Sequence, residues 1–118
     1  MTSLMDEIGG GGKNPLFPHA PADWTTAAAL EGARREGLEL GEDHWEALRA
    51  LQEYYARRAT TAVNLRELHD ALDEKFHRRG GIRYLYLLFP RGPVAQGCRI
   101  AGLKAPAGAT DKGFGSVA

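Results

Sequence analysis

The sequence is poor in the residues that crosslink secreted proteins and anchor membrane proteins. Its single cysteine, Cys98, excludes an intramolecular disulfide and offers at most one thiolate to a metal. No apolar stretch reaches the roughly 18 residues that cross a bilayer, and the first residues lack the basic and apolar regions of a signal peptide. These absences favour a reducing compartment, and we expect a cytoplasmic protein with no membrane partner.

The sequence also lacks the patterns of common cofactor, metal and hydrolytic sites. Residues 9–14, GGGGKN, miss the Walker spacing and its final Ser or Thr. No two histidines have the i, i+4 spacing that places two imidazoles on one helical face. The only serines are Ser3 and Ser116, so a Ser-His-Asp hydrolase has no obvious nucleophile. We therefore expect no cofactor and no metal, and we interpret His44 as an exposed or capping residue.

Net charge is absent as well, because fifteen acidic side chains balance fifteen basic ones. The chain as a whole therefore has no field that attracts nucleic acid, and such binding would need a local basic patch. The second half is rich in arginine, which leaves open a helix-turn-helix reader of DNA. A solvated rim neutralised by nearby acids such as Glu67 and Asp70 is the favoured interpretation of these arginines.

The length of 118 residues and the hydrophobic fraction of 43% predict one globular domain. Glycines and prolines disfavour a regular helix in residues 1–22, which we expect to form an irregular N-terminal arm. Residues 23–103 carry the apolar stripes of a helical domain. Residues 104–118 are rich in Ala and Gly without an apolar stripe, and we expect a flexible C-terminal arm.

Helix signals divide residues 23–103 into about five short helices, which predicts an all-α bundle. The first is expected to start at the N-cap Asp23 and to stop at Gly37. Later helices are predicted from Glu42, from the N-cap Asn64 to the turn at 78–81, over the apolar run 82–89, and from Pro93 to Gly102. In the helix from Glu42, an inward stripe recurs at steps of three and four and ends at Tyr55.

Cys98 falls midway along the predicted last helix, where two interpretations compete. A free cysteine is most often a small buried apolar side chain. A reactive one needs access and a lowered pKa, and Arg91 and Arg99 supply positive charge nearby in the sequence, while Gly97 leaves room for a partner. Neighbours on a helix point about 100° apart, so Arg99 need not face the sulfur.

Three stretches resemble the DsrC/TusE (DsvC) family of small sulfur-relay proteins, the gamma subunit of dissimilatory sulfite reductase. They are LGEDHWEALRALQEYY from Leu40, RELHDALDEKF from Arg66 and RYLYLLFPRGPVAQGCRIAGLKAP from Arg83. The last is the most specific, because its order of motifs is long. The resemblance covers about residues 22–109.

This resemblance implies a compact helical fold preceded by a small hairpin, and a cysteine that takes up sulfane sulfur as a persulfide. It implies a TusA-like or DsrE-like sulfur donor and a sulfite reductase-like or other acceptor enzyme. In the family, the principal cysteine lies on a C-terminal arm, eleven positions after a second one at the place of Cys98. Here that position holds Ala109, and the sequence continues through residues 111–118.

Three functions therefore remain open. The first is sulfur relay or persulfide acceptance through Cys98. The second is a non-catalytic DsrC-like regulator that keeps the docking surface, for which the candidate residues are Arg83, Arg91, Arg99 and Lys104. The third is a DNA-binding regulator. Whether the chain is an enzyme depends on Cys98, because the family's principal sulfur carrier is replaced by Ala109.

Overall fold

The structure is a computed structural model that describes residues 14–58 and 62–109, and within these ranges every regular element is a helix. The α-helices are α2 (Thr26–Arg35), α3 (Glu42–Arg57), α4 (Leu65–Lys75), α5 (Ile82–Leu88) and α6 (Ala95–Ala101), with a short 3-10 helix η1 (His77–Arg79). The all-α prediction is confirmed. No helix in the described ranges is long and apolar enough to cross a membrane.

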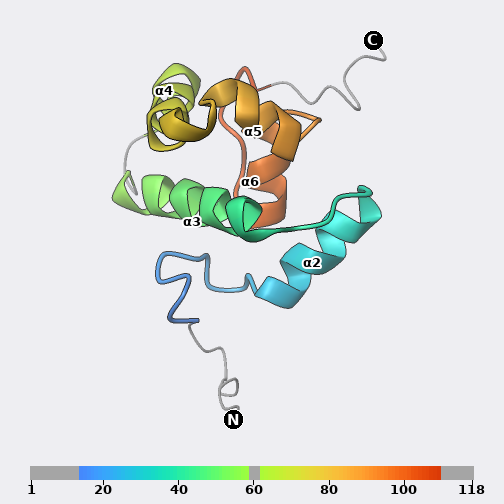
Figure 1. Ribbon diagram of the computed structural model, residues 1–118. Coiled ribbons are helices and arrows are strands. Elements are labelled where there is room, and N and C mark those ends of the chain that lie inside the picture. The colour runs from blue at the N-terminus through green and yellow to red at the C-terminus, as the bar shows by residue number, and fades with distance from the viewer. Residues whose placement is uncertain (1–13, 59–61, 110–118) are drawn as a thin grey trace.

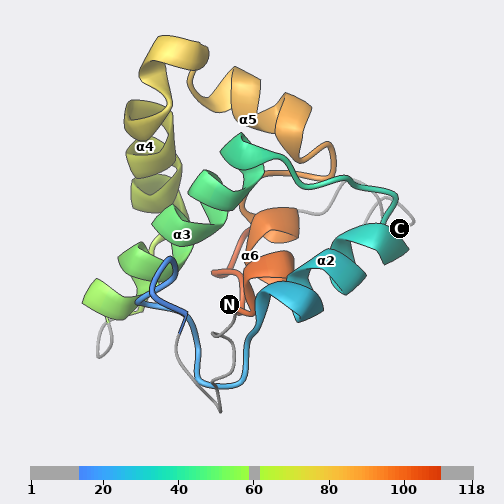
Figure 2. The same cartoon turned by 60° about the horizontal axis from the view of Figure 1, so that its bottom comes forward.

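Helix α6 lies at the centre of the fold, packed between α2 and α3 (Figure 1). Helices α4 and α5 follow one another above α3 in Figure 1, and the turned view shows α6 between α3 and α2 (Figure 2). Gly97 lets α6 approach α3 closely, because a Cβ there would lie 2.8 Å from Leu51 Cδ1. The room that we expected Gly97 to leave for a partner is therefore filled by Leu51.

The predicted start of the first helix is wrong by two residues. The N-cap is Thr25, whose side-chain oxygen accepts a hydrogen bond from the Ala28 amide at 3.0 Å. Asp23 precedes the helix, in a turn closed by the bond from Trp24 N to Pro21 O. The predicted stop is confirmed, since Gly37 has a φ of +73° just beyond the C-cap.

Two side chains that the sequence analysis identified as capping candidates, His44 and Asn64, cap α3 and α4. His44 Nδ1 accepts from the Gly41 amide at 3.0 Å, and its Nε2 donates to the Leu88 carbonyl at 2.9 Å. His44 is therefore a capping residue that also ties the start of α3 to the end of α5. Asn64 caps α4 by accepting from the Glu67 amide at 3.0 Å.

Gly102 ends α6 in the left-handed conformation, with a φ of +80°. A Cβ at this position would lie 2.8 Å from Trp24 Cδ1, so both the backbone and the packing require glycine. The Trp24 indole donates to the Ile100 carbonyl at 2.9 Å. The sequence that precedes α2 is thereby fixed to the end of α6.

The described part of the N-terminal arm, residues 14–22, consists of turns, as expected for an irregular segment. It is nevertheless packed: Phe17 is buried, with its ring 5.0 Å from Trp24 and 5.7 Å from Trp45. The hairpin implied by the resemblance does not occur in residues 14–22, and residues 1–13 lie outside the described part of the chain.

Residues 104–109, which we name the closing segment, differ from the free arm expected after Leu103. Ala105 and Ala109 pack against the core, and the Lys104 carbonyl accepts a hydrogen bond from Tyr55. The rest of the predicted C-terminal arm, with the extension 111–118, lies outside the described residues. The division at residue 104 stays a prediction.

Candidate functional site

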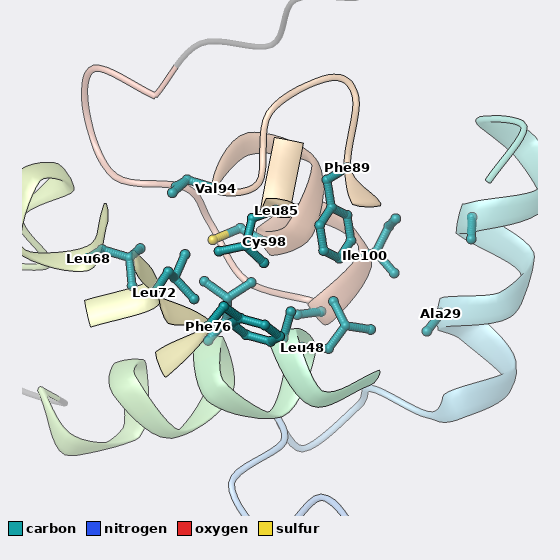
Figure 3. Close-up of a cluster of buried hydrophobic side chains, with 14 residues drawn as sticks. Ala29, Leu48, Leu68, Leu72, Phe76, Leu85, Phe89, Val94, Cys98 and Ile100 are labelled. Atoms are coloured by element: carbon teal, nitrogen blue, oxygen red, sulfur yellow. The ribbon is translucent and has the colours of Figure 1, made fainter. Parts of the chain in front are cut away.

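Helix α6 directs Cys98 into the core. The residue is 0% exposed, and its neighbours in the buried cluster come from α3, α4 and α5 (Figure 3). Figure 3 shows the sulfur in the middle of this cluster, near Leu85. Position 98 therefore has the burial of an apolar residue, which is the more common role of a free cysteine.

One hydroxyl group provides the polar contact of the buried thiol. The Cys98 S–H donates to the Tyr55 hydroxyl at a distance of 3.7 Å. Tyr55 in turn donates its own hydrogen to the Lys104 backbone carbonyl at 2.6 Å. The thiol is thus linked through one side chain of α3 to the closing segment.

Burial determines the protonation state of this thiol. It raises the pKa of Cys98 from its ordinary value of 9.0 to about 11, and the hydrogen bond with Tyr55 offsets only part of that effect. Burial also raises the pKa of the Tyr55 hydroxyl above its usual range. At neutral pH, Cys98 is therefore a protonated thiol, and the nucleophilic thiolate is scarce in the closed structure.

Because the pKa of Cys98 is raised in the folded state, the free energy of unfolding should fall at alkaline pH. A thiol whose pKa is higher in the folded state stabilises that state below the unfolded pKa, and this contribution disappears as the pH rises toward the folded pKa. Between pH 7 and pH 10, wild-type protein should lose about 1.4 kcal/mol more unfolding free energy than Cys98→Ala. Urea unfolding at both pH values measures this difference, and equal losses in the two proteins would contradict the raised pKa.

The arginines expected near Cys98 instead converge on Glu36. Arg99 Nε lies 2.8 Å from Glu36 Oε2, and Arg91 Nη1 lies 3.5 Å from Glu36 Oε1. The Gln96 side-chain amide donates to Glu36 Oε1 at 2.9 Å, and these contacts hold the pKa of Glu36 below its usual range, chiefly through the hydrogen bond from Arg99. Arg99 therefore stabilises a carboxylate just after α2 instead of the Cys98 thiolate.

The four candidate docking residues do not share one set of contacts. Arg91 and Arg99 share Glu36, whereas the exposed Arg83 lies on α5. Lys104 has an exposed side chain, and its backbone belongs to the site through Tyr55. Partner docking by these residues stays a prediction.

Sequence reasoning missed two residues of the site, Tyr55 and Glu36. Tyr55 was interpreted only as the end of an apolar stripe. Its hydroxyl was the available signal, because a tyrosine that packs against the core needs a polar partner for that group. Glu36 follows the end of α2, where a negative charge opposes the helix dipole, so a cationic partner could have been expected there.

Several of the arginines in the described residues are paired with acidic side chains. Arg57 pairs with Glu53 at 2.6 Å, and Arg58 lies 3.5 Å from Glu67. Arg79 contacts both Asp43 and Glu46. This pairing agrees with the neutralised rim and gives no support to a DNA-binding surface. Within residues 14–58 and 62–109, no three His, Cys, Asp or Glu side chains are grouped to hold a metal.

Comparison with known proteins gives concordant matches. Residues 14–109 match the family model described as "DsrC like protein". "Sulfurtransferase TusE" of Salmonella typhimurium is 43% identical over 84 residues, which are 70% of this chain and 76% of that protein. "Sulfurtransferase TusE" of Photorhabdus laumondii is 42% identical over 86 residues, which are 72% of this chain and 77% of the relative.

A solved structure agrees with these sequence matches. The NMR structure of Allochromatium vinosum DsrC superimposes with a TM-score of 0.61 at 40% sequence identity. The match covers 75% of this chain and 79% of that one. Sequence and fold therefore match the same group of proteins.

Proposed function

Because this chain belongs to the DsrC-like family, we propose that it works in a sulfur relay, with Cys98 as its sulfur acceptor. The identity of more than 40% to sulfurtransferases named TusE, over about three quarters of their length, supports the relay role. Cys98 is the one thiol in the sequence, so a persulfide on this chain has no other place to form. A reducing compartment such as the cytoplasm would keep that thiol available.

The proposed step is a thiolate exchange on a sulfane sulfur. The Cys98 thiolate attacks the outer sulfur of a donor persulfide, R–S–SH, and forms a new S–S bond. The S–S bond of the donor breaks, and the donor leaves as the thiolate R–S⁻ while Cys98 becomes Cys98–S–SH. We propose a TusA-like or DsrE-like protein as the donor, and a sulfite reductase-like or other sulfur-accepting enzyme as the recipient.

The closed structure requires that this step begin with an opening of the site. Cys98 is fully buried, and its raised pKa leaves little thiolate at neutral pH. A bound partner that exposes Cys98 to water would return its pKa toward the ordinary value and provide access. Sulfur uptake would then depend on docking, which limits loss of sulfur to unrelated thiols.

The same burial favours a second candidate, a non-catalytic protein that docks on relay partners. The residue eleven positions after Cys98 is Ala109, which cannot carry sulfur, and Cys98 is held in the core. Such a protein would compete with a sulfur-carrying relative for the same partner. Its binding would be unchanged by Cys98→Ser.

Sulfur uptake separates the two candidates. Incubation with a persulfidated TusA-like donor should add sulfur to the native protein, seen by intact mass as increments of about 32 Da, the mass of one sulfur atom. Cys98→Ser, which replaces the thiol by a hydroxyl of similar size, should show no increment. If the wild type docks on the donor and gains no sulfur, the acceptor role is wrong and the non-catalytic role is supported.

A further inference from the structure

A single side chain connects the thiol with the closing segment, residues 104–109. The Tyr55 hydroxyl lies 2.6 Å from the Lys104 carbonyl oxygen and 3.7 Å from Cys98 Sγ. The first contact has the short distance of a strong O–H···O bond, and the second is a weaker contact with sulfur. Tyr55 stands on α3, whereas the other two residues are on and just after α6.

Two backbone hydrogen bonds lie in or next to the closing segment. The Leu103 amide bonds to the Cys98 carbonyl at the end of α6, and the Ala109 amide bonds within the segment to the Pro106 carbonyl. Ala105 and Ala109 contribute small apolar contacts to the core. Residues 104–109 lie outside the regular helices and most have small side chains. Such a segment opens at a lower free energy than the helices beneath it.

We propose that Tyr55 is a positioning residue whose hydroxyl latches the closing segment to α3 and thereby controls access to Cys98. The hydroxyl donates a hydrogen bond to the Lys104 carbonyl and accepts one from the Cys98 S–H, so one group makes both contacts. Release of the Lys104 carbonyl frees the segment and removes the restraint on the tyrosine that lies against the thiol. The role of the latch in controlling sulfur uptake rests on the proposed function. The latching of the closing segment by Tyr55 does not depend on it.

The test is the rate at which iodoacetamide alkylates Cys98 in native buffer. Tyr55→Phe keeps the half-buried ring and removes the hydroxyl. It should raise the alkylation rate about fivefold, which is the effect of one hydrogen bond of ordinary net strength on an opening equilibrium. Tyr54→Phe is the matched control. The Tyr54 hydroxyl lies 3.4 Å from the exposed Glu67 carboxylate, and its hydrogen bond involves neither Cys98 nor Lys104. Its alkylation rate should equal that of the wild type.

Denaturant dependence distinguishes a latch from a general loss of stability. Local release of six residues exposes little surface, so low urea concentrations should hardly change the raised rate in Tyr55→Phe. An unchanged rate, or a raised rate with the full urea dependence of global unfolding, would overturn the proposal.

Hydrogen exchange supplies a second measurement that also works if the variant folds poorly. In the wild type, the Ala109 amide should exchange faster than the Cys98 amide, which bonds to the Val94 carbonyl at 2.9 Å within α6. Equal protection of the two amides would contradict a separately opening segment. Neither readout involves sulfur transfer: a Cys98 that is unmasked in Tyr55→Phe but never takes up sulfur would refute the proposed function and leave the latch intact.

Discussion

At pH 8, iodoacetamide should label Cys98 at least about a hundredfold more slowly in the native protein than in the urea-unfolded chain. Labelling needs both a thiolate and access to the sulfur, and burial restricts both in the closed structure. A pKa raised from 9.0 to about 11 reduces the thiolate fraction about a hundredfold at this pH. The complete burial of the side chain then excludes the reagent except during openings of the site.

The comparison is made within one protein by measuring the labelled mass over time with and without urea. Because the sequence has one cysteine, every adduct reports on Cys98, and Cys98→Ser is the blank. A native rate within tenfold of the unfolded rate would mean that the thiol is not sealed. In that case sulfur uptake would need no opening, and the proposed dependence on a docked partner would be wrong.

The helices could be predicted from the sequence because their signals are local. The stripe that ends at Tyr55, the cap at Asn64 and the stop at Gly102 each depend on residues within a few turns. The choice between Asp23 and Thr25 as the first cap could not be settled in this way, since both residue types cap helices well. It is settled by Trp24, which must reach Phe17 and the end of α6 and therefore lies outside the helix.

The chemical state of Cys98 could not be predicted, because it depends on contacts over long sequence separations. Its position on α6 followed from local signals, but its burial depends on how α3, α4 and α5 pack around that helix. Its hydrogen-bond partner is 43 residues away, and the next group in the chain of bonds is a backbone carbonyl, which has no sequence signature. Positive charge near Cys98 in the sequence was misleading, since Arg99 turns to Glu36.

Glu36→Ala should lower the free energy of unfolding by about 2–3 kcal/mol, which would make it one of the more damaging polar substitutions in the fold. Glu36 has a side chain only 14% exposed, and it accepts hydrogen bonds from Arg99 and from the buried Gln96. Alanine would leave the Gln96 amide without this acceptor and would remove the negative charge between Arg91 and Arg99. The loss therefore includes desolvation of a buried donor as well as an ion pair.

Glu31→Ala is the matched control, because Glu31 lies on α2, the helix that ends at Glu36, and also contacts two arginines. Its partners Arg34 and Arg35 are neighbours on the surface of α2, and exposed pairs of this kind contribute little to stability. Urea unfolding of both variants should therefore show a large loss for Glu36→Ala and almost none for Glu31→Ala. Equal effects would show that the Glu36 network is an ordinary surface ion pair. A large difference would show that the carboxylate fixes α6, and with it Cys98, against α2.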